Sequence, residues 1–407
     1  MGFQQGLSGL NAAAKNLDVI GNNVSNANTV GFKGGQAHFA DVFANSLAAS
    51  GGVNVGIGVS VPAVEQVFSQ GNITTTNNPL DLAINGKGFF RLSDNGVISY
   101  GRNGQFQLDK NGYIVNDAGA RLTGYLPSAN GTLITAAPVD LQITTSDIAP
   151  QTTTNVGALL NLDSRAAILN PASLNLNDPT TYNSATSVTT YDSLGNPHAM
   201  SMYFVKSAAN TWQVFAANDG TQIGAGPLGA LNFLTNGSID TGTTTLPFAV
   251  SAPVSTGATT PLTFSLDFAG TTQFGSNFGV NQLTQDGFTS GRLSGYNISA
   301  DGIVLGRYSN GQTKTLGQIA LADFTDSQGL QPLGNNVWAE TSESGPALVG
   351  TPNSGSLGVL QSGAVEESNV DLTAELVNMI TAQRVYQANA QTIKAQDTIM
   401  QTLVSGL

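Results

Sequence analysis

Residues 372–407 read LTAELVNMITAQRVYQANAQTIKAQDTIMQTLVSGL, and apolar side chains recur in them every seven residues. A seven-residue repeat is typical of a helix that packs along one line against a partner helix. The segment therefore predicts a long C-terminal helix. The predicted assembly seam of this helix consists of Leu372, Leu376, Met379, Tyr386, Ile393 and Met400.

The stretch EESNVDLTAE, residues 366–375, precedes this repeat and predicts the start of the helix. Ser368 and Asp371 have the three-residue spacing of a capping box. Glu366 and Glu367 are explained as negative charges that favour the positive end of the helix dipole, rather than as a catalytic carboxylate pair.

Residues 3–26 show a related pattern at the other end of the chain, with apolar positions at alternating steps of four and three. At 1.5 Å per residue, this helix would span roughly 36 Å. Its predicted assembly seam consists of Phe3, Leu7, Leu10, Leu17 and Val24. Because an isolated helix is marginal in water, we expect the two terminal helices to pair with each other. Apolar positions off the seams indicate further partners, either an intrachain domain or neighbouring subunits.

The stretch NNVSNANTVGFKGG, residues 22–35, follows the first helix and is rich in asparagine and glycine. Asparagine favours turns, and Gly31 supplies the conformational freedom that redirects the chain. Phosphate binds at helix N-termini, whereas this is a C-terminal end, where the dipole repels anions. The stretch therefore predicts a hinge rather than a phosphate site.

The middle of the chain has the signature of β-structure. Seven Asn-Gly and three Asp-Gly dipeptides occur between residues 85 and 311. Such pairs between alternating hydrophobic residues favour type I′ hairpin turns, in which both central residues have positive φ. Between residues 80 and 126 the turns follow one another closely enough to predict an antiparallel meander.

The predicted fold class is mainly β with α-helical termini, in a nested arrangement of domains. Residues 1–70 and 365–407 form a helical core domain, in which the terminal helices pair like a coiled coil. Residues 71–145 and 285–364 form an inner antiparallel β-domain. Residues 146–284, rich in Thr, Ser and Ala and nearly free of charge, form an outer inserted β-domain.

Composition excludes several classes of function. The net charge is −12, and the 14 Lys and Arg residues are scattered singly, which argues against nucleic acid and anionic membrane surfaces as partners. The chain has no cysteine, and His38 and His198 are too few and too far apart for a zinc site. We expect both histidines to be surface or hydrogen-bonded polar residues. No apolar run is long enough to insert into a membrane.

Motifs for catalysis or cofactor binding are weak. Lys87 lies beside glycines but lacks the following Ser or Thr of a P-loop, and Asp109–Gly112 lacks the later ligands of a calcium loop. A glycosidase built on two carboxylates stays open, but the chain has only two tryptophans for a sugar groove. The sequence therefore predicts no enzyme, no cofactor and no metal.

Several long motifs carry a family resemblance. The segments GLSGLNAAAKNLDVIGNNVSNANTVGFK (6–33) and GAVEESNVDLTAELVNMITAQRVYQANAQTIKAQDTIM (363–400) resemble the end signatures of the bacterial flagellar axial proteins of the rod and hook. Between them INGKGFF, GRNGQFQLD, TSVTTYDSLGNPH and YSNGQTKTLGQIALADF are most similar to the hook proteins of that family. The signature turn that the resemblance marks consists of Asn22, Asn23, Asn26, Asn28, Thr29, Gly31 and Lys33.

The resemblance implies an extracellular structural protein that polymerises with itself into the curved, flexible tube joining rod and filament. It implies the hook cap, the distal rod, the hook–filament junction proteins and the type III export apparatus as partners, with export that needs no cleavable signal peptide. It also implies that the terminal helices line the tube and the β-domains face outward. A distal-rod or other axial protein, and less readily a β-rich surface adhesin, remain alternatives.

Overall fold

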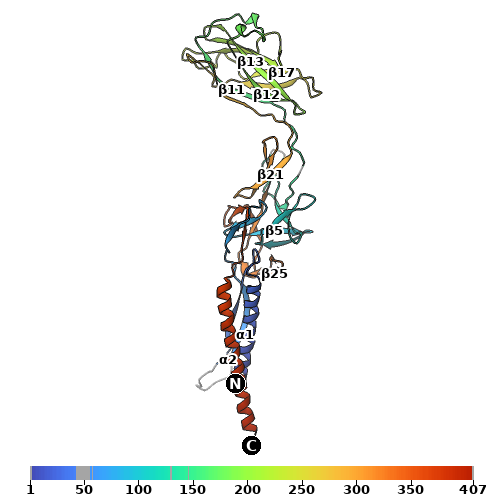
Figure 1. Cartoon of the computed structure of the whole chain (residues 1–407), viewed down its shortest axis with the longest axis vertical. Helices are drawn as coiled ribbons and strands as arrows, with labels where there is room; N and C mark the ends of the chain where they lie inside the picture. Colours follow the sequence, from blue (N-terminus) through green and yellow to red (C-terminus); the bar gives the residue numbers. More distant parts are fainter. Residues whose placement is uncertain (1, 43–55, 57, 129–130, 145, 406–407) are drawn as a thin grey trace. The chain divides into compact units, whose positions relative to one another are not determined.

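The computed structural model describes residues 2–42, 56, 58–128, 131–144 and 146–405. These residues form two compact units (Figure 1). Unit 1 comprises the described residues within Met1–Thr145, Gly295–Arg307 and Thr313–Leu407, and unit 2 comprises Ser146–Ser294 and Tyr308–Gln312. The predicted class is confirmed, since the chain is mainly β with one helix at each end. Neither helix is long and apolar enough to cross a membrane.

The two terminal helices are α1 (Gly2–Ser25) and α2 (Leu372–Ser405), as the apolar spacing predicted. The carboxylate of Asp371 accepts the N–H groups of Thr373 at 2.8 Å and Ala374 at 3.1 Å, so Asp371 is the N-cap of α2. The predicted capping role of Ser368 is wrong. Its hydroxyl accepts the N–H of Val370, which lies before the helix begins.

The helices α1 and α2 lie side by side and antiparallel, and small residues of α1 form the contact. A Cβ atom on Gly6 would lie 3.0 Å from Cγ1 of Ile393, and one on Gly9 would lie 2.8 Å from Oδ1 of Asn389. Near the other end, Asn23 donates to the carboxylate of Glu375 at 3.0 Å. The close approach of the two backbones therefore depends on glycine and alanine in α1.

This contact corrects the predicted seam of α1. Phe3 and Leu7 are 50% and 44% exposed, and Leu10, Leu17 and Val24 are only partly buried. The buried line lies one residue away, and the glycines in it let α2 approach closely. It consists of Gly6, Ala13, Ile20 and Asn23, with Gly9 half-buried.

In α2, the predicted assembly seam is only partly buried in the single chain. Met379 and Ile393 are half-buried, and Tyr386 between them is 37% exposed. Leu376 of the predicted seam is 44% exposed, and a neighbouring line of α2 is buried instead. This line begins one residue before Leu376 and consists of Ala382, which is buried, and the half-buried Glu375, Asn389 and Gln396. Leu372 and Met400 are also exposed.

Unit 1 contains one large sheet, with the strand order β21-β22-β23-β9-β5-β6-β26-β25. The strands of this path are β5 (Phe89–Asp94), β6 (Val97–Gly101), β9 (Arg121–Tyr125), β21 (Leu293–Ile298), β22 (Ile303–Tyr308), β23 (Thr313–Ile319), β25 (Gln331–Gly334) and β26 (Val337–Ala339). Strands attached beside the path are β7 (Phe106–Leu108), β8 (Ile114–Asn116), β10 (Val139–Asp140), β24 (Leu321–Asp323) and β27 (Leu348–Gly350). The strand β5 pairs with both β6 and β9, so the region is more than a simple meander.

Three strand pairs connect this sheet to the helices. They are β1 (Gly35–Val42) with β2 (Gly58–Gln66), β3 (Ile73–Thr75) with β29 (Ala364–Glu366), and β4 (Leu82–Asn85) with β28 (Val359–Ser362). A short 3₁₀ turn, η3 (Ser327–Gly329), completes the elements of the unit. The pairs β3–β29 and β4–β28 join the segment after α1 to the segment before α2. The end of α1 and the start of α2 are therefore held next to each other by strand pairing.

The hairpin prediction from Asn-Gly pairs holds in part. Asn95 and Gly96 both have positive φ, 50° and 92°, in the two-residue turn between β5 and β6. Asp219 and Gly220 also both have positive φ, 49° and 80°. At the other described Asn-Gly pairs the asparagine has an ordinary φ, because those turns are longer or irregular. Asn130 lies outside the described residues.

Unit 2, which carries the labels β11, β12, β13 and β17 in Figure 1, contains two five-stranded sheets. The two sheets share one apolar core. The first sheet has β11 (Asn155–Asp163), β17 (Phe248–Ala252), β18 (Leu262–Asp267), β19 (Thr272–Phe274) and β20 (Gly279–Gln285). The second has β12 (Ser184–Tyr191), β13 (Pro197–Ala208), β14 (Thr211–Asn218), β15 (Thr221–Gln222) and β16 (Gly229–Asn232), and the 3₁₀ turns are η1 (Pro171–Ser173) and η2 (Pro179–Thr181). Trp212 is fully buried between the sheets and donates to Gln273 at 2.8 Å.

His198 is buried in unit 2 between two carboxylates. Its Nδ1 lies 2.7 Å from Asp219 and its Nε2 lies 3.3 Å from Asp192. The same oxygen of Asp192 accepts from Asn196 at 2.9 Å and Thr256 at 2.6 Å, so this carboxyl is ionised. Burial lowers the pKa of His198, but the two carboxylates outweigh it, and the net pKa lies above its ordinary value.

Unit 2 should therefore lose stability as the pH rises. A raised folded-state pKa gives a contribution that is fully present below the ordinary pKa of about 6.5 and is lost as the pH passes the raised value. We expect His198→Gln to cost about 1.5–3 kcal/mol at pH 6, the typical loss of a hydrogen bond to a charged group, and to cost less at alkaline pH. Urea unfolding followed by the fluorescence of Trp212, in a Trp338→Phe background, measures this. The same variant effect at both pH values would contradict a charged histidine, and His38→Gln is the matched control in unit 1.

Candidate functional site

The turn after α1 is organised by its own polar side chains. The amide of Asn26 donates to the carbonyl and the side chain of Asn22, both at 3.0 Å, and Thr29 donates to Asn26 at 3.2 Å. These bonds close the last turn of the helix, as the asparagine-rich sequence predicted. Asn28 of the signature turn is exposed.

Gly31 ends this turn with a φ of 70°, the positive value that the hinge prediction requires. Its N–H donates to the carbonyl of Glu366 at 2.8 Å. A Cβ atom here would lie 2.5 Å from the backbone nitrogen of Asn103 and 2.7 Å from the backbone carbon of Arg102. Both the conformation and the contact therefore require glycine at this position.

Asn23 connects α1 to two other elements. Its side-chain amide donates to the carbonyl of Gly35 and its oxygen accepts the N–H of Gly35, both at 2.8 Å. The amide also donates to Glu375 in the first turn of α2. The side chain thus fixes the start of β1 and the start of α2 against the end of α1.

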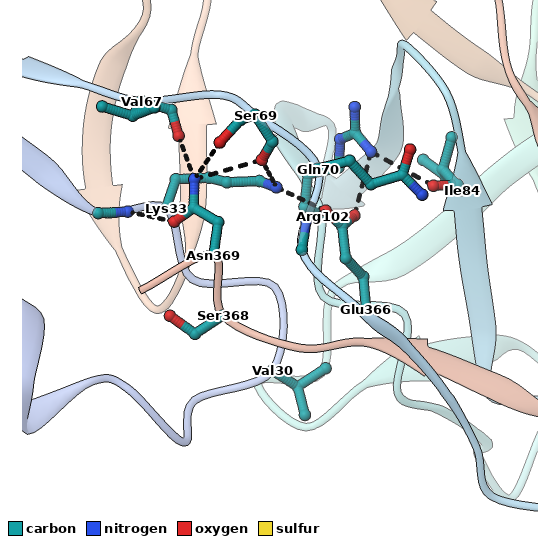
Figure 2. A network of polar contacts seen from close by, with 12 residues as sticks. Val30, Lys33, Val67, Ser69, Gln70, Ile84, Arg102, Glu366, Ser368 and Asn369 are labelled. Atoms are coloured by element: carbon teal, nitrogen blue, oxygen red, sulfur yellow. Dashed lines mark hydrogen bonds and ion pairs between the residues drawn. The ribbon is translucent and has the colours of Figure 1, made fainter. Parts of the chain in front are cut away.

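Lys33, Arg102 and Glu366 form a buried ion network beside these contacts (Figure 2). The Nζ of Lys33 lies 2.5 Å from Oε1 of Glu366 and donates to the carbonyl of Ser69 at 2.7 Å. Arg102 donates to the other carboxylate oxygen at 3.0 Å. The N–H of Gly71 donates to Oε1 at 2.9 Å, so both oxygens of Glu366 are occupied.

Asn369 extends the network on the side of α2 (Figure 2). Its oxygen accepts the N–H of Gly34 at 2.8 Å. Its amide donates to the carbonyls of Val67 at 2.6 Å and Ser69 at 3.2 Å. Asn369, three residues after Glu366, therefore binds both the residue next to Lys33 and the segment 67–69.

The network holds two cations and one anion away from water. The side chains of Lys33 and Glu366 are fully buried, and that of Arg102 is 5% exposed. Burial lowers the pKa of Lys33 and of Arg102, and the negative charge of Glu366 opposes this in both. Arg102 also donates to the carbonyl of Gly86 at 2.9 Å, while its Nε is buried without a hydrogen-bond partner.

This arrangement joins three distant parts of the sequence. Lys33 follows α1, Arg102 follows β6 in the large sheet, and Glu366 ends β29 before α2. The interpretation of Glu366 as a charge at the helix start is therefore wrong, because it lies in a strand and forms ion pairs with two buried cations. Sequence reasoning did not identify Arg102 or Asn369 as members of a site. Because both carboxylate oxygens of Glu366 and the Nζ of Lys33 are bonded to other protein groups, the network suits mechanical connection rather than catalysis.

Comparison with known proteins gives matches to parts of the chain and to its full length. Family models match in four places: "Flagella basal body rod protein" over residues 3–33, "Flagellar hook protein FlgE/F/G D1 domain" over 83–157, "Flagellar basal body protein FlaE D2 domain" over 161–288, and "Flagellar basal body rod FlgEFG protein C-terminal" over 361–406. The first match covers α1 from residue 3 and contains Lys33, and the last match contains α2 and Glu366.

Full-length relatives and a solved structure agree. The chain is 47% identical to the flagellar hook protein FlgE of Escherichia coli (strain K12) and 46% identical to that of Salmonella typhimurium, each over 100% of both chains. The crystal structure of Helicobacter pylori flagellar hook protein FlgE2 has a similar fold, with a TM-score of 0.54 at 16% identity over 71% of this chain and 99% of that one. The resemblance seen in the motifs is confirmed, and the chain belongs to the family of flagellar hook proteins FlgE.

Proposed function

We propose that this chain is the structural subunit of the bacterial flagellar hook and that it polymerises with itself through its terminal helices. The polymer is a curved, flexible tube that couples the rod to the filament and transmits torque. Family membership supports the identity of the polymer. The relatives are structural proteins and not enzymes. The candidate site is likewise a set of contacts that join segments of the chain.

The observation that carries the role of the helices is their exposed apolar surface. The small residues of α1 that face α2 leave the large apolar side chains on the outside. Between about 44% and 59% of each of these side chains is exposed: Phe3, Leu7, Leu372, Leu376, Val377, Ile380 and Val385. An exposed apolar surface of this extent marks a protein–protein contact. The exposed members of the predicted assembly seams, such as Phe3, Leu7 and Leu376, are thus proposed as contacts between subunits.

The ion network is proposed to transmit force between the helices and the β-structure of unit 1. If the helices contact neighbouring subunits, force on them reaches the β-structure only through the contacts that join the helices to that β-structure. Lys33, Arg102 and Glu366 supply a connection that is buried and therefore little weakened by salt. Asn23 and Asn369 add hydrogen bonds on either side of it.

Each part of the nested arrangement has its own proposed role. We propose a tube-forming part at 1–70 and 365–407, an inner β-part at 71–145 and 285–364, and an outer part at 146–284. By resemblance the further partners are the hook cap, the distal rod, the hook–filament junction proteins and the type III export apparatus. By the same resemblance, the subunit reaches the flagellum through that apparatus, without a cleavable signal peptide.

Leu376→Glu tests the role of the exposed surface. Because Leu376 is exposed in the single chain, we expect unfolding free energy to change by less than about 0.5 kcal/mol. Assembly should nevertheless be lost, because the charge would have to be buried between subunits. Hooks are counted by electron microscopy of cells that produce only the variant, and stability is measured on the purified monomer.

Gln391→Glu is the matched control, since it adds the same charge to an exposed polar position of α2. It should leave hooks intact. Normal hooks from Leu376→Glu would show that this part of the seam does not form a subunit contact.

A further inference from the structure

The helix α2 is longer than the helix on which it packs. Gly6 of α1 lies against Ile393, and Gly9 lies against Asn389. Four residues before Gly6, α1 begins at Gly2, so its end lies near residue 397 of α2. We call residues 397–405 the projecting end, and Figure 1 shows α2 continuing beyond the first turn of α1.

The projecting end continues the line of α2 that packs on α1. In heptad steps from Met379 and Ile393, the next position is Met400. Met400 is 61% exposed and Val404, on the following turn, is 72% exposed, whereas Ile393 is half-buried. The projecting end is uncharged after Asp397. Its apolar line is therefore built to pack against other residues but has no described residue of its own chain over it.

A partly apolar groove lies near the end of α1 and the start of α2, and its lining also includes the acidic residues Asp371 and Glu375. It has a volume of about 920 Å³ and runs between α1, α2 and the pair β1–β2. Pockets of this size are at the upper end of those that bind ligands. Its apolar lining consists of Ala12, Ala13, Val19, Ile20, Ala37, Phe39, Val59, Val67, Val370, Ala374, Ala382 and Val385. We call it the terminal groove.

The projecting end cannot fill the terminal groove of its own chain. Asn389 is the last residue of α2 that lines the groove. Met400 lies eleven residues further along the same helix, roughly 16 Å away at 1.5 Å per residue. The two surfaces therefore need a second molecule to meet.

We infer that the projecting end of one copy docks in the terminal groove of a second copy. This inference rests on the proposed function, because it names a contact within the hook polymer. End and groove are different surfaces, so the contact is heterologous, and its repetition builds an open filament rather than a closed dimer. The uncharged residues after Asp397 lie against the apolar lining, while the polar side chains of Asn16, Asn378 and Asn389 in the groove remain available to Gln401 and Thr402.

Cysteine cross-linking tests this contact, because the chain has no cysteine of its own. Met400→Cys is combined with Val385→Cys, which is exposed in the groove. A disulfide forms only when the Cβ atoms approach to about 3.5–4.5 Å. We expect hooks from cells with this double variant to give a ladder of covalent multimers on a non-reducing gel after mild oxidation.

Met400→Cys with Gln387→Cys is the matched control, because Gln387 is exposed on the same helix but does not line the groove. It should give no ladder. Hooks of normal shape without a ladder from the Val385 pair, or with a disulfide within one chain, would overturn the inference and leave the proposed function intact. If the Val385 pair does not assemble, Val404→Cys with Phe39→Cys is read in the same way. Failure of the unaltered chain to form hooks would instead contradict the proposed function.

Discussion

Glu366→Gln should abolish hook formation and strongly destabilise unit 1. The substitution keeps the size of the side chain but leaves Lys33 and Arg102 buried without their shared anion. Breaking a buried ion pair by removing one partner typically costs about 3–5 kcal/mol, a large part of the ~5–15 kcal/mol that stabilises a domain. Urea unfolding followed by helical circular dichroism measures this, since α1 and α2 both belong to unit 1.

Glu367→Gln is the matched control, because the neighbouring side chain is exposed. We expect it to change the unfolding free energy by less than about 0.5 kcal/mol. Adding Lys33→Met to Glu366→Gln should recover part of the loss, because one of the two unpaired cations is then removed. An equal, small effect of Glu366→Gln and Glu367→Gln would show that the network does not hold the helices to the sheet.

Gly31→Val should have the second largest effect on the free energy of unfolding and on hook formation. A φ of 70° costs an L-residue roughly 1–2 kcal/mol, and more for a β-branched side chain. The new Cβ would also lie 2.5 Å from the backbone nitrogen of Asn103, which must then move. Since Arg102 precedes Asn103, that movement would displace the guanidinium from Glu366. We expect a loss of more than about 2 kcal/mol in the same unfolding experiment and no hooks in cells.

Gly21→Ala is the contrasting change, because Gly21 lies inside α1 and a Cβ there would meet no atom within 4 Å. It should stabilise the helix by about 0.5–1 kcal/mol. Unaltered assembly of Gly31→Val would contradict the account of the hinge.

Periodicity predicted both helices because each contributes many positions to one pattern. It misplaced the buried line of α1, since Gly6, Gly9 and Ala13 carry no hydrophobic signal and pack through their small size. Phe3 and Leu7 gave the strong signal, and they are the side chains left exposed in the single chain. A sequence records that a residue is apolar but not whether its partner belongs to the same molecule.

Residue patterns could not predict the ion network, because its members are far apart in the sequence. Lys33 and Glu366 are 333 positions apart, and neither has a local motif that specifies the other. The acidic residues before α2 suggested a helix dipole, which is the commoner local explanation for Glu366. Gly31 was different, since the need for a positive φ at a chain reversal is a local property.

Electron microscopy of flagellar hooks tests the central claim most directly. Cells from which the gene for this chain has been deleted are supplied either with the full chain or with residues 71–364 alone, and their basal bodies are isolated. We predict that deletion removes the hook, that the full chain restores a curved tube, and that residues 71–364 do not. Curved hooks of normal appearance in the deletion strain, or straight rod-like tubes built from the full chain, would contradict the assignment of this chain as the hook subunit.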